Sequence, residues 1–515
     1  MQIIDFIIIA LSLFISIYFG MYFSKKQTST HIFFTTDRTV PHWAVGLSIL
    51  ATLISSVTFI AYPGAGYLGK WVLLVQAIMV VIVLSLIVWF VVPLYRKIIK
   101  ISTYEYFEKR FSFFTRLYSS IAFTFTHFSK MGTVFFLLAL AISNILNINP
   151  YITVWIVGLV IIYVTLKGGM EAIIWLDAIQ GLLLILGAIL TVILIFVKTP
   201  GGPSTVFQII KEYNKIDFGP YDLNLAKLTF IVMALNGIFY GIQKYATDQT
   251  IVQRYLTTKT DEDAVKAALT GVYLSLPIWT LFMLVGSLLF AFYKANPVLP
   301  ENLKAEEVFI YFMMYELPPI IKGLVISALI AAAISSLDSD LNSISAVAVE
   351  DYYLRFKPNA TEKEKLKFAK IIITLTGIAS LLIATLYVAS GSEGILGIVF
   401  GLYAIFSGGV AGIFLLGIFS KRANKYGLHI AIIICILFTA WATLTTTKIN
   451  DKLILNLGKY NFPHHTYMIG VYTHLIIIII GYLASLFFKS PKVDENLTIY
   501  PALKKLNKKK FTNVS

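Results

Sequence analysis

The sequence predicts an all-α polytopic membrane protein with about thirteen transmembrane helices. Two observations support this fold class. Hydrophobic residues make up 58% of the 515 residues and charged residues only 13%, and a soluble protein of this length cannot bury so much apolar side chain. Long uncharged stretches also recur from one end of the chain to the other, and each approaches the ~20 residues that a helix needs to cross a bilayer.

The predicted spans follow one another with short connections, which leave no room for a separate extramembrane domain. In chain order the spans are Ile3–Phe23, Trp43–Tyr62, Val72–Leu94, Leu117–Ile145, Tyr151–Leu166, Ala172–Val197, Leu228–Tyr245, Ala267–Tyr293, Ile320–Ala348, Phe368–Ala389, Gly394–Phe419, Leu428–Leu444 and Met468–Phe488. The first span lacks a basic start and a small-residue cleavage site, so it is predicted to be a retained helix rather than a signal peptide.

Basic residues gather in alternate connections. With the N-terminus outside, about 29 lysines and arginines, Arg254 among them, fall in inner loops and about 10 outside, which is the bias of a membrane protein. The net charge of +15 is explained by this topology, so no nucleic-acid partner is expected. Residues 489–515 are predicted to be a basic, disordered cytoplasmic tail. The single cysteine, Cys435, rules out an intramolecular disulfide framework.

A hydroxyl-rich patch, Ala331–Ser343, lies inside the ninth apolar span. Helical spacing puts Ser335, Asp338 and Ser339 on neighbouring stripes of one helix side. Hydroxyl and carboxylate oxygens are the hard ligands that a small cation needs when it loses water. Such groups are costly inside a membrane, so the patch is predicted to be a functional site.

A second polar segment, Ala51–Phe59, interrupts the second span with serines and threonines. These residues are mediocre helix formers because their hydroxyls compete for backbone hydrogen bonds. A helix break here would free carbonyls for an ion and hydroxyls for a solute. An intact helix whose hydroxyls pack against neighbouring helices is the alternative.

Two charged residues lie inside other spans. Asp177 is predicted at a depth similar to that of Ser335, as an ion ligand or as a hydrated or lysine-paired carboxylate near the interface. Lys130 lies near the middle of its span, too far from the cytoplasm to reach it. It therefore either pairs with a buried acid or offers its charge to an anionic solute. No glycine-rich phosphate loop, HExxH helix or nucleophile elbow occurs in a supporting context, so the chain is not predicted to be an enzyme.

Four stretches resemble segments of the sodium:solute symporter family. Gly168–Gln180 is similar to its GG-x-x-A-V-x-W-T-D-x-I-Q segment, with Leu176 in place of the usual threonine. Glu105–Phe111, Gln249–Tyr255 and Gly412–Asn424 resemble its E-Y-x-x-x-R-F, Q-x-x-V-Q-R and G-x-F-L-L-G-x-F-x-K-R-A-N elements. The resemblance runs in order along nearly the whole chain.

The resemblance implies a LeuT-type core of five plus five helices in inverted repeats, with an extra leading helix. Residues 1–488 would then form one transporter domain. Within it, residues 3–23 form the leading helix, 43–197 and 228–419 the two repeats, and 428–488 the trailing helices.

The resemblance also implies where sodium binds. The main site would use the carbonyls of Ala51, Ile54 and Ala332 and the hydroxyls of Ser335 and Ser336. Some members hold a second sodium nearer the cytoplasm, and the matching positions are Asp177, Ser335, Asp338 and Ser339. Asp338 departs from these members, which carry Ser or Thr there. Its carboxylate could strengthen the second ion site, hold a proton or form a salt bridge.

Within the family, the chain looks most like bacterial sialic-acid and sugar transporters. Lys130 aligns with an arginine that binds the sialic-acid carboxylate, and Ser55, Ser56 and Thr58 align with hydroxyl contacts to the same group. Gly241 replaces an asparagine of sugar-transporting relatives, which argues against a plain hexose. The candidate substrate-binding residues are Ser55, Ser56, Thr58, Leu73, Gln76, Lys130 and Gln243.

The expected function is therefore sodium-coupled uptake of sialic acid, or of another acidic sugar or carboxylate, by alternating access. The expected setting is a monomer in the lipid of the bacterial plasma membrane, with one or two Na⁺ ions as the only metal. A neutral monosaccharide or another small solute is the alternative cargo. An ion channel or a solute sensor is the alternative class, although no repeated filter segment and no signalling domain is visible in the sequence.

Overall fold

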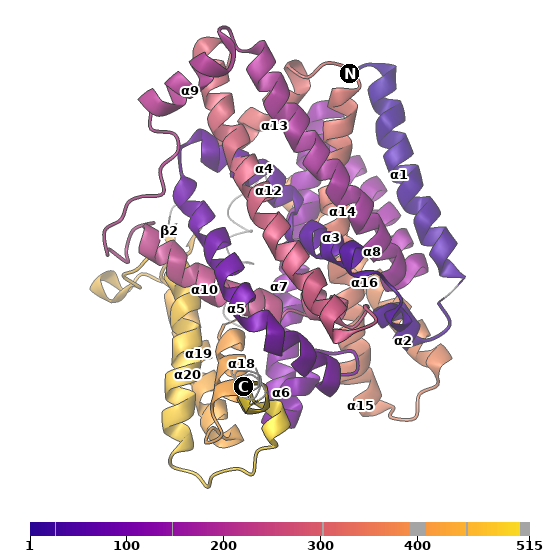
Figure 1. Ribbon diagram of the computed structural model, residues 1–515, viewed down its shortest axis with the longest axis vertical. Coiled ribbons are helices and arrows are strands. Elements are labelled where there is room, and N and C mark those ends of the chain that lie inside the picture. The colour runs from indigo at the N-terminus through magenta and orange to yellow at the C-terminus, as the bar shows by residue number, and fades with distance from the viewer. Residues whose placement is uncertain (26, 147, 301–302, 391–407, 450–451, 505–515) are drawn as a thin grey trace, which may run out of the picture.

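The computed structural model describes all residues except 26, 147, 301–302, 391–407, 450–451 and 505–515. Long helices dominate it (Figure 1). They are α1 (Ile3–Ser24), α5 (Leu74–Ile98), α7 (Phe113–Leu146), α8 (Pro150–Lys198), α12 (Asp261–Ala295), α14 (Ile321–Val347), α16 (Glu362–Ser390), α19 (Lys425–Leu444) and α20 (Tyr467–Ser485). In the described part of the chain, nine helices are long and apolar enough to cross a membrane, or ten if one bent pair is a single span.

Shorter elements join these helices. They are α2 (Thr30–Thr35), η1 (Thr36–Arg38), α3 (His42–Leu53), α4 (Ser56–Tyr67), η2 (Trp71–Leu73), α6 (Glu105–Arg110), α9 (Gly202–Glu212), α10 (Phe230–Ala246), α11 (Gln249–Tyr255), η3 (Ala305–Glu307), α13 (Val308–Tyr315), η4 (Ala348–Tyr353, a π-helical stretch), α15 (Leu354–Phe356), α18 (Val410–Phe419), η5 (Gly458–Tyr460) and η6 (Glu495–Leu497). Two short strands, β1 (Lys448–Ile449) and β2 (Lys452–Leu453), pair antiparallel between α19 and α20.

Helix α8 is bent at Gly169, where φ is 60° and ψ is −165°. Its 49 residues would extend about 73 Å as one straight helix, more than twice the ~30 Å hydrocarbon core. Only glycine adopts this backbone conformation without strain, so the Gly-Gly pair before Met170 divides the helix into two arms. The two arms correspond to the predicted spans Tyr151–Leu166 and Ala172–Val197, and the division into two spans is confirmed.

Two further membrane segments are interrupted. Helices α3 and α4 meet at a 60° bend, and Ile54 and Ser55 between them have extended backbone angles. The predicted break in the second span is therefore confirmed, and the intact-helix alternative is wrong. Helices α10 and α11 are interrupted at Thr247 and Asp248, which also have non-helical angles. The sequence did not predict this second break.

Every predicted span has a helix in the structure except Gly394–Phe419, most of which lies outside the described residues; α18 is its described end. The first part of the predicted tail is ordered. Ile499 N donates to Ile418 O (3.1 Å), and the Tyr106 hydroxyl donates to Leu497 O (3.0 Å). The prediction of disorder is therefore wrong up to residue 504, and residues 505–515 lie outside the described part.

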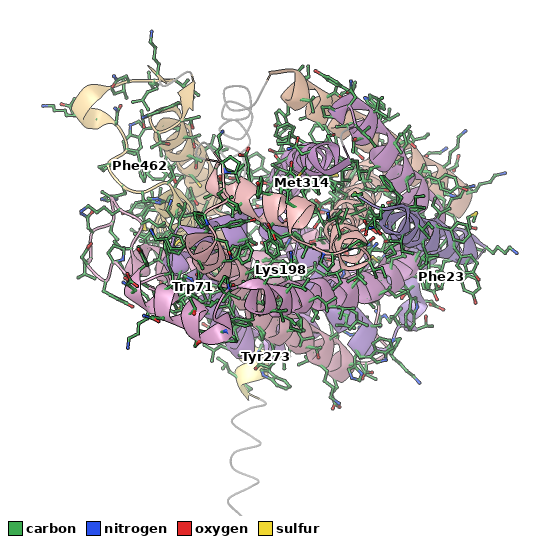
Figure 2. All side chains as sticks on the ribbon, turned by 90° about the horizontal axis from the view of Figure 1, so that it is seen from above. Phe23, Trp71, Lys198, Tyr273, Met314 and Phe462 are labelled. Carbon is green, nitrogen blue, oxygen red and sulfur yellow. The ribbon has the colours of Figure 1, made fainter. Side chains whose placement is uncertain are left out.

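Helix α14 forms the centre of the molecule, and all its residues from Val325 to Val347 are buried. It packs against α1, α3, α7 and α8. Helix α1 lies at one edge of the bundle, and α19 and α20 lie at the opposite side (Figure 1). The view from above shows the same separation, with Phe23 of α1 and Phe462, just before α20, at opposite ends (Figure 2). The hydroxyl-rich patch thus lies deep inside the protein.

Candidate functional site

The hydroxyl-rich patch presents unpaired oxygens in the protein interior. Ser335 and Ser336 are fully buried, and neither hydroxyl has a hydrogen-bond partner among the described residues. Asp338 Oδ2 and Asp177 Oδ1 are likewise buried without a partner in the described structure. Ser335 lies next to Asp177, although no hydrogen bond with ordinary geometry joins them. Unsatisfied buried oxygens are rare in folded proteins, and these oxygens are available as ligands for a cation.

Arg254 reaches into this patch from α11. Its Nη2 lies 2.8 Å from Asp177 Oδ2 and donates to Ser339 Oγ at 2.7 Å. Its Nε donates to Ser48 Oγ (2.8 Å), and that hydroxyl donates to Asp177 Oδ2 (2.5 Å). The sequence placed Arg254 in an inner loop. In the structure it lies in helix α11 instead of a loop, and its side chain is fully buried.

The buried charges in the patch do not cancel. Asp177 and Asp338 are both fully buried, as is Arg254, and these three groups carry a formal charge of −1. Asp338 forms no ion pair within the described residues, so the salt-bridge alternative for this residue finds no partner there. A buried charge without compensation is strongly unfavourable, and one monovalent cation would neutralise this cluster, either a sodium ion or a proton on Asp338.

The predicted main-site residues lie on two segments, the end of α3 and the middle of α14. Ala51, Ile54, Ala332, Ser335 and Ser336 are each buried. The hydroxyl of Thr52, in the last turn of α3, lies 3.4 Å from Ser339 Oγ, which places the end of α3 beside α14. Because α3 ends at Leu53, the carbonyls after that of Leu50, which accepts from Ile54 N (3.2 Å), have no intrahelical donor. These carbonyls and the α14 hydroxyls are the oxygen ligands that sodium prefers.

A cavity of about 360 Å³ lies next to the helix break, within the usual size range for small-molecule pockets. Five of the predicted substrate-binding residues line it: Ser55, Thr58, Gln76, Lys130 and Gln243. Ser56 and Leu73 lie outside its lining. Ser56 is fully buried, and its hydroxyl has no partner in the part of the chain described.

Lys130 is both paired and accessible. Its Nζ lies 3.1 Å from Asp340 Oδ2, while 29% of its side chain remains exposed and lines the cavity. The two sequence alternatives, a structural pair and a solute contact, are therefore compatible. Asp340 itself is fully buried on α14, two residues after Asp338.

Sequence reasoning missed the rest of the ionic groups around the cavity. His127 Nδ1 lies 2.7 Å from Asp340 Oδ1, and its Nε2 lies 3.1 Å from Asp248 Oδ2. Lys244 Nζ lies 2.6 Å from the same Asp248 oxygen. His127 is one helical turn from Lys130, which was the available signal. The partners Asp248 and Asp340 are more than 100 residues away, so spacing alone could not connect them.

These contacts define the charge of the cavity. When Asp248 and Asp340 are both ionised they only accept hydrogen bonds, and His127 between them then donates from both ring nitrogens as an imidazolium. His127, Lys130 and Lys244 then carry three positive charges against the two negative charges of Asp248 and Asp340. The net charge of +1 favours an anionic solute.

The cavity and the oxygen-rich patch are joined through two short segments. Helix α14 carries Ser335 and Ser339 of the patch and also Asp340, which contacts the cavity residues His127 and Lys130. Helix α11 begins at Asp248, whose side chain accepts from Thr250 N (2.9 Å) as an N-cap, and carries Arg254 one and a half turns later. A shift of either helix therefore changes both sites.

Comparison with known proteins places this geometry in a family. Residues 33–435 match the model of the sodium:solute symporter family. The chain is 32% identical over 482 residues to the sodium/sialic acid symporter NanT of Aliivibrio fischeri, covering 92% of each chain. It is 35% identical over 423 residues to the sodium/sialic acid symporter SiaT of Proteus mirabilis, covering 81% of this chain and 85% of SiaT.

Solved structures agree with the sequence comparison. A Na⁺-coupled sialic acid symporter in its substrate-bound outward-open state has a TM-score of 0.87 and 32% identity, covering 96% of this chain and all of the other. Mhp1, a nucleobase-cation-symport-1 transporter, has a TM-score of 0.55 at 15% identity, covering 90% of this chain and 96% of Mhp1, and so shares the fold. The predicted all-α, LeuT-type architecture is confirmed. The chain belongs to the sodium:solute symporter family.

Proposed function

We propose that this protein imports sialic acid, or a closely similar sugar acid, together with sodium by alternating access. One observation carries the proposal: a cavity of net positive charge adjoins a buried oxygen cluster of net negative charge, and both use α14. An anion fits the first and a small cation fits the second. The relatives NanT and SiaT are named as sodium/sialic acid symporters, which supports the same cargo.

The proposed main sodium site consists of the carbonyls of Ala51, Ile54 and Ala332 with the hydroxyls of Ser335 and Ser336. Its support is the broken α3–α4 segment, whose last carbonyls lack helical donors, and the two unpartnered hydroxyls in the described structure. Sodium bound here would hold the helix break against α14 and so favour one state of the transporter.

The proposed second sodium site uses Asp177, Ser335, Asp338 and Ser339. Its support is the formal charge of −1 and the oxygens Asp177 Oδ1 and Asp338 Oδ2, which have no partner in the described part of the chain. Ser339 Oγ accepts from Arg254 at 2.7 Å and lies 3.5 Å from Asp338 Oδ1, so it is part of the same cluster. Arg254 would therefore fix the ligands in place rather than compete with sodium for both carboxylates.

In the substrate cavity, the proposed role of Lys130 is to attract the sugar carboxylate. A lysine is a point charge and lacks the planar fork of an arginine, so hydroxyl and amide groups must supply directional hydrogen bonds. Ser55, Thr58, Gln76 and Gln243 line the cavity and have such groups. The ion pair with Asp340 fixes the Lys130 ammonium group and limits how far it can move toward the ligand.

The energetics favour two sodium ions. Moving one charge through about 100 mV supplies about 2.3 kcal/mol, and a tenfold sodium gradient supplies about 1.4 kcal/mol. One sodium with a monoanion carries no net charge, so it supports only about tenfold accumulation. Two sodium ions with the same monoanion support accumulation of several thousand-fold.

We also propose the arrangement of the two repeats, the orientation of the chain in the membrane and its oligomeric state. Two repeats, residues 43–197 and 228–419, each begin with an interrupted helix, α3–α4 and α10–α11, as inverted repeats would. The chain would lie in the bacterial inner membrane as a functional monomer, with its N-terminus outside and its tail in the cytoplasm, because basic residues concentrate on that side.

The decisive test compares sialic acid with its uncharged methyl ester. Purified protein is titrated with each ligand in sodium and in potassium buffer, and binding is followed by calorimetry. We expect sialic acid to bind only with sodium, and the ester about tenfold or more weaker because it lacks the charge that Lys130 attracts. A neutral monosaccharide that binds more tightly than sialic acid under the same conditions would overturn the proposed cargo.

A Lys130→Gln variant tests whether Lys130 causes the difference in affinity between sialic acid and its methyl ester. It should lower the affinity for sialic acid and leave the affinity for the methyl ester nearly unchanged. Lys215→Gln is the matched control, because Lys215 is a partly buried lysine beyond the cavity lining that contacts Tyr67 O and the Phe290 ring.

A further inference from the structure

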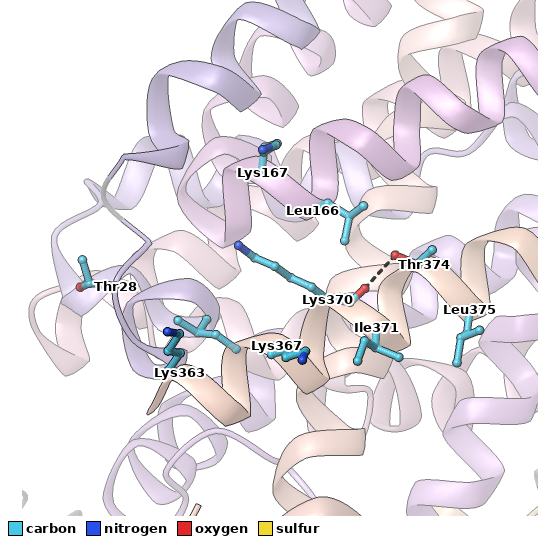
Figure 3. A pocket seen from close by; sticks show the side chains of 10 residues that line it. Thr28, Leu166, Lys167, Lys363, Lys367, Lys370, Ile371, Thr374 and Leu375 are labelled. Carbon is cyan, nitrogen blue, oxygen red and sulfur yellow. Dashed lines mark hydrogen bonds between the residues drawn. The ribbon is translucent and has the colours of Figure 1, made fainter. Parts of the chain in front are cut away.

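A second large cavity lies away from the proposed transport pathway. It has a volume of about 780 Å³ and lies between the first arm of α8 and the beginning of α16, with Thr28 of the α1–α2 connection at its edge. Figure 3 shows that its lining has two different ends. Lysines gather at one end, and Leu166, Ile371 and Leu375 lie toward the other.

The groove exists because α8 and α16 diverge. A Cβ on Gly158 of α8 would lie 2.1 Å from a Leu381 methyl group, and a Cβ on Gly377 of α16 would lie 2.6 Å from Ile162. Glycine therefore allows the two helices to touch in this region. One to two turns further along, Leu166 and Ile371 line open space instead. The groove lies at the end of both helices that the proposed topology places in the cytoplasm.

Four lysines face this groove without an acidic partner. Lys167, Lys363, Lys367 and Lys370 line it, and none forms an ion pair with a described residue. The nearby carboxylates are engaged elsewhere: Glu362 binds Lys365 and Thr30, and Glu364 binds Lys357. The groove therefore has a strong positive charge at its cytoplasmic end.

The other end of the groove is apolar and continues along the membrane-facing side of α16. Ile371 and Leu375 are 43% and 59% exposed, and the same stripe continues through Leu382 and Leu386. Leu159 and Tyr163 are exposed on the facing arm of α8. A soluble anion would use the lysines but would gain nothing from these apolar side chains. A molecule with a negative head and long acyl chains matches both ends.

We propose that this groove binds an anionic phospholipid of the cytoplasmic leaflet, such as phosphatidylglycerol. Its phosphate contacts Lys363, Lys367 and Lys370, and its acyl chains run along Ile371 and Leu375. Basic pockets between transmembrane helices on the cytoplasmic side are suited to such headgroups. The inference uses the proposed topology but not the proposed cargo. A bound lipid would hold α16 against the first arm of α8, which ends at the Gly169 bend.

Native mass spectrometry of the full chain, purified without sodium or sugar, tests the site. The protein is titrated with phosphatidylglycerol, phosphatidylcholine and the soluble headgroup glycerophosphoglycerol. We expect phosphatidylglycerol to bind most tightly. The combined change Lys363→Gln, Lys367→Gln and Lys370→Gln should weaken its binding by about tenfold or more and leave phosphatidylcholine unchanged.

Two further variants separate the alternatives. The control changes Lys97, Lys100 and Lys259 to Gln, because these exposed lysines lie outside the groove, and it should bind phosphatidylglycerol like the wild type. Thr374→Phe fills the groove but keeps every lysine, and it should also weaken the binding of phosphatidylglycerol. The proposal is overturned if the control and the triple groove variant lose phosphatidylglycerol binding equally. It is also overturned if glycerophosphoglycerol binds tightly and Thr374→Phe does not affect that binding. Neither result depends on whether sialic acid is transported.

Discussion

Arg254 and Asp177 form an ion pair in which both side chains are fully buried and Nη2 lies 2.8 Å from Oδ2. The pair joins α11 to the second arm of α8. The Arg254 guanidinium also donates hydrogen bonds to the hydroxyls of Ser48 and Ser339. A buried ion pair is seldom retained for stability alone, because desolvation opposes the attraction between the charges. Among the described residues, Oδ1 of Asp177 and Oδ2 of the neighbouring Asp338 have no hydrogen-bond partner.

Breaking this pair from one side should be costly. Arg254→Gln leaves two buried carboxylates without a counter-charge, so we expect a loss of about 3–5 kcal/mol in the free energy of unfolding. Chemical denaturation in detergent, followed by tryptophan fluorescence, measures it. Arg355→Gln is the control, because Arg355 forms a half-exposed pair with Glu108, and such pairs contribute about 0–1 kcal/mol. If both variants lose the same stability, Arg254 has no special role in the interior.

The Arg254 network also shows what could be predicted from sequence. Helices, the break near Ser55 and the hydroxyl-rich patch were predictable because each depends on residues close together in the chain. Arg254 was assigned to a loop because a short polar segment after a predicted span is typical of the membrane–water interface. Its partner Asp177 is 77 residues away, and only the folded chain shows that α11 enters the protein. Asp248 and Asp340 are 121 and 213 residues away from His127, so their contacts with this cavity residue could not be predicted from sequence either.

Close packing of α4 against α12 should depend on Gly286. A Cβ at this position would lie 1.9 Å from Pro63 O and 2.7 Å from Tyr67 N, and backbone atoms cannot move aside cheaply. Gly286→Ala should therefore lower stability by about 1–3 kcal/mol through overpacking. Gly470→Ala is the matched control, because the nearest atom would be 3.8 Å away. A thermal-unfolding series compares the two, and equal midpoints would contradict the close approach.

Asp338 should set the affinity of the proposed second sodium. Asp338→Asn preserves the shape of the side chain but brings the formal charge of the cluster from −1 to zero. We expect the sodium concentration for half-maximal uptake to rise by about tenfold or more, because the buried cation loses the negative charge of Asp338 that balances its own. Uptake into proteoliposomes at several sodium concentrations measures this. An unchanged sodium dependence would remove Asp338 from the ion site.

Ser336 should affect sodium binding in a way that another buried serine of α14 does not. Ser336→Ala removes one proposed ligand of the main sodium, and a contact between a hydroxyl and a charged group is worth about 1.5–3 kcal/mol, or about 10- to 150-fold in affinity. Ser327→Ala is the matched control. Its hydroxyl is also buried and unpartnered within the described residues, but it lies nine positions nearer the helix start, about 13 Å away. Sodium-dependent protection against thermal unfolding should weaken in Ser336→Ala alone. Equal protection in both variants would place the main ion away from the hydroxyl-rich patch.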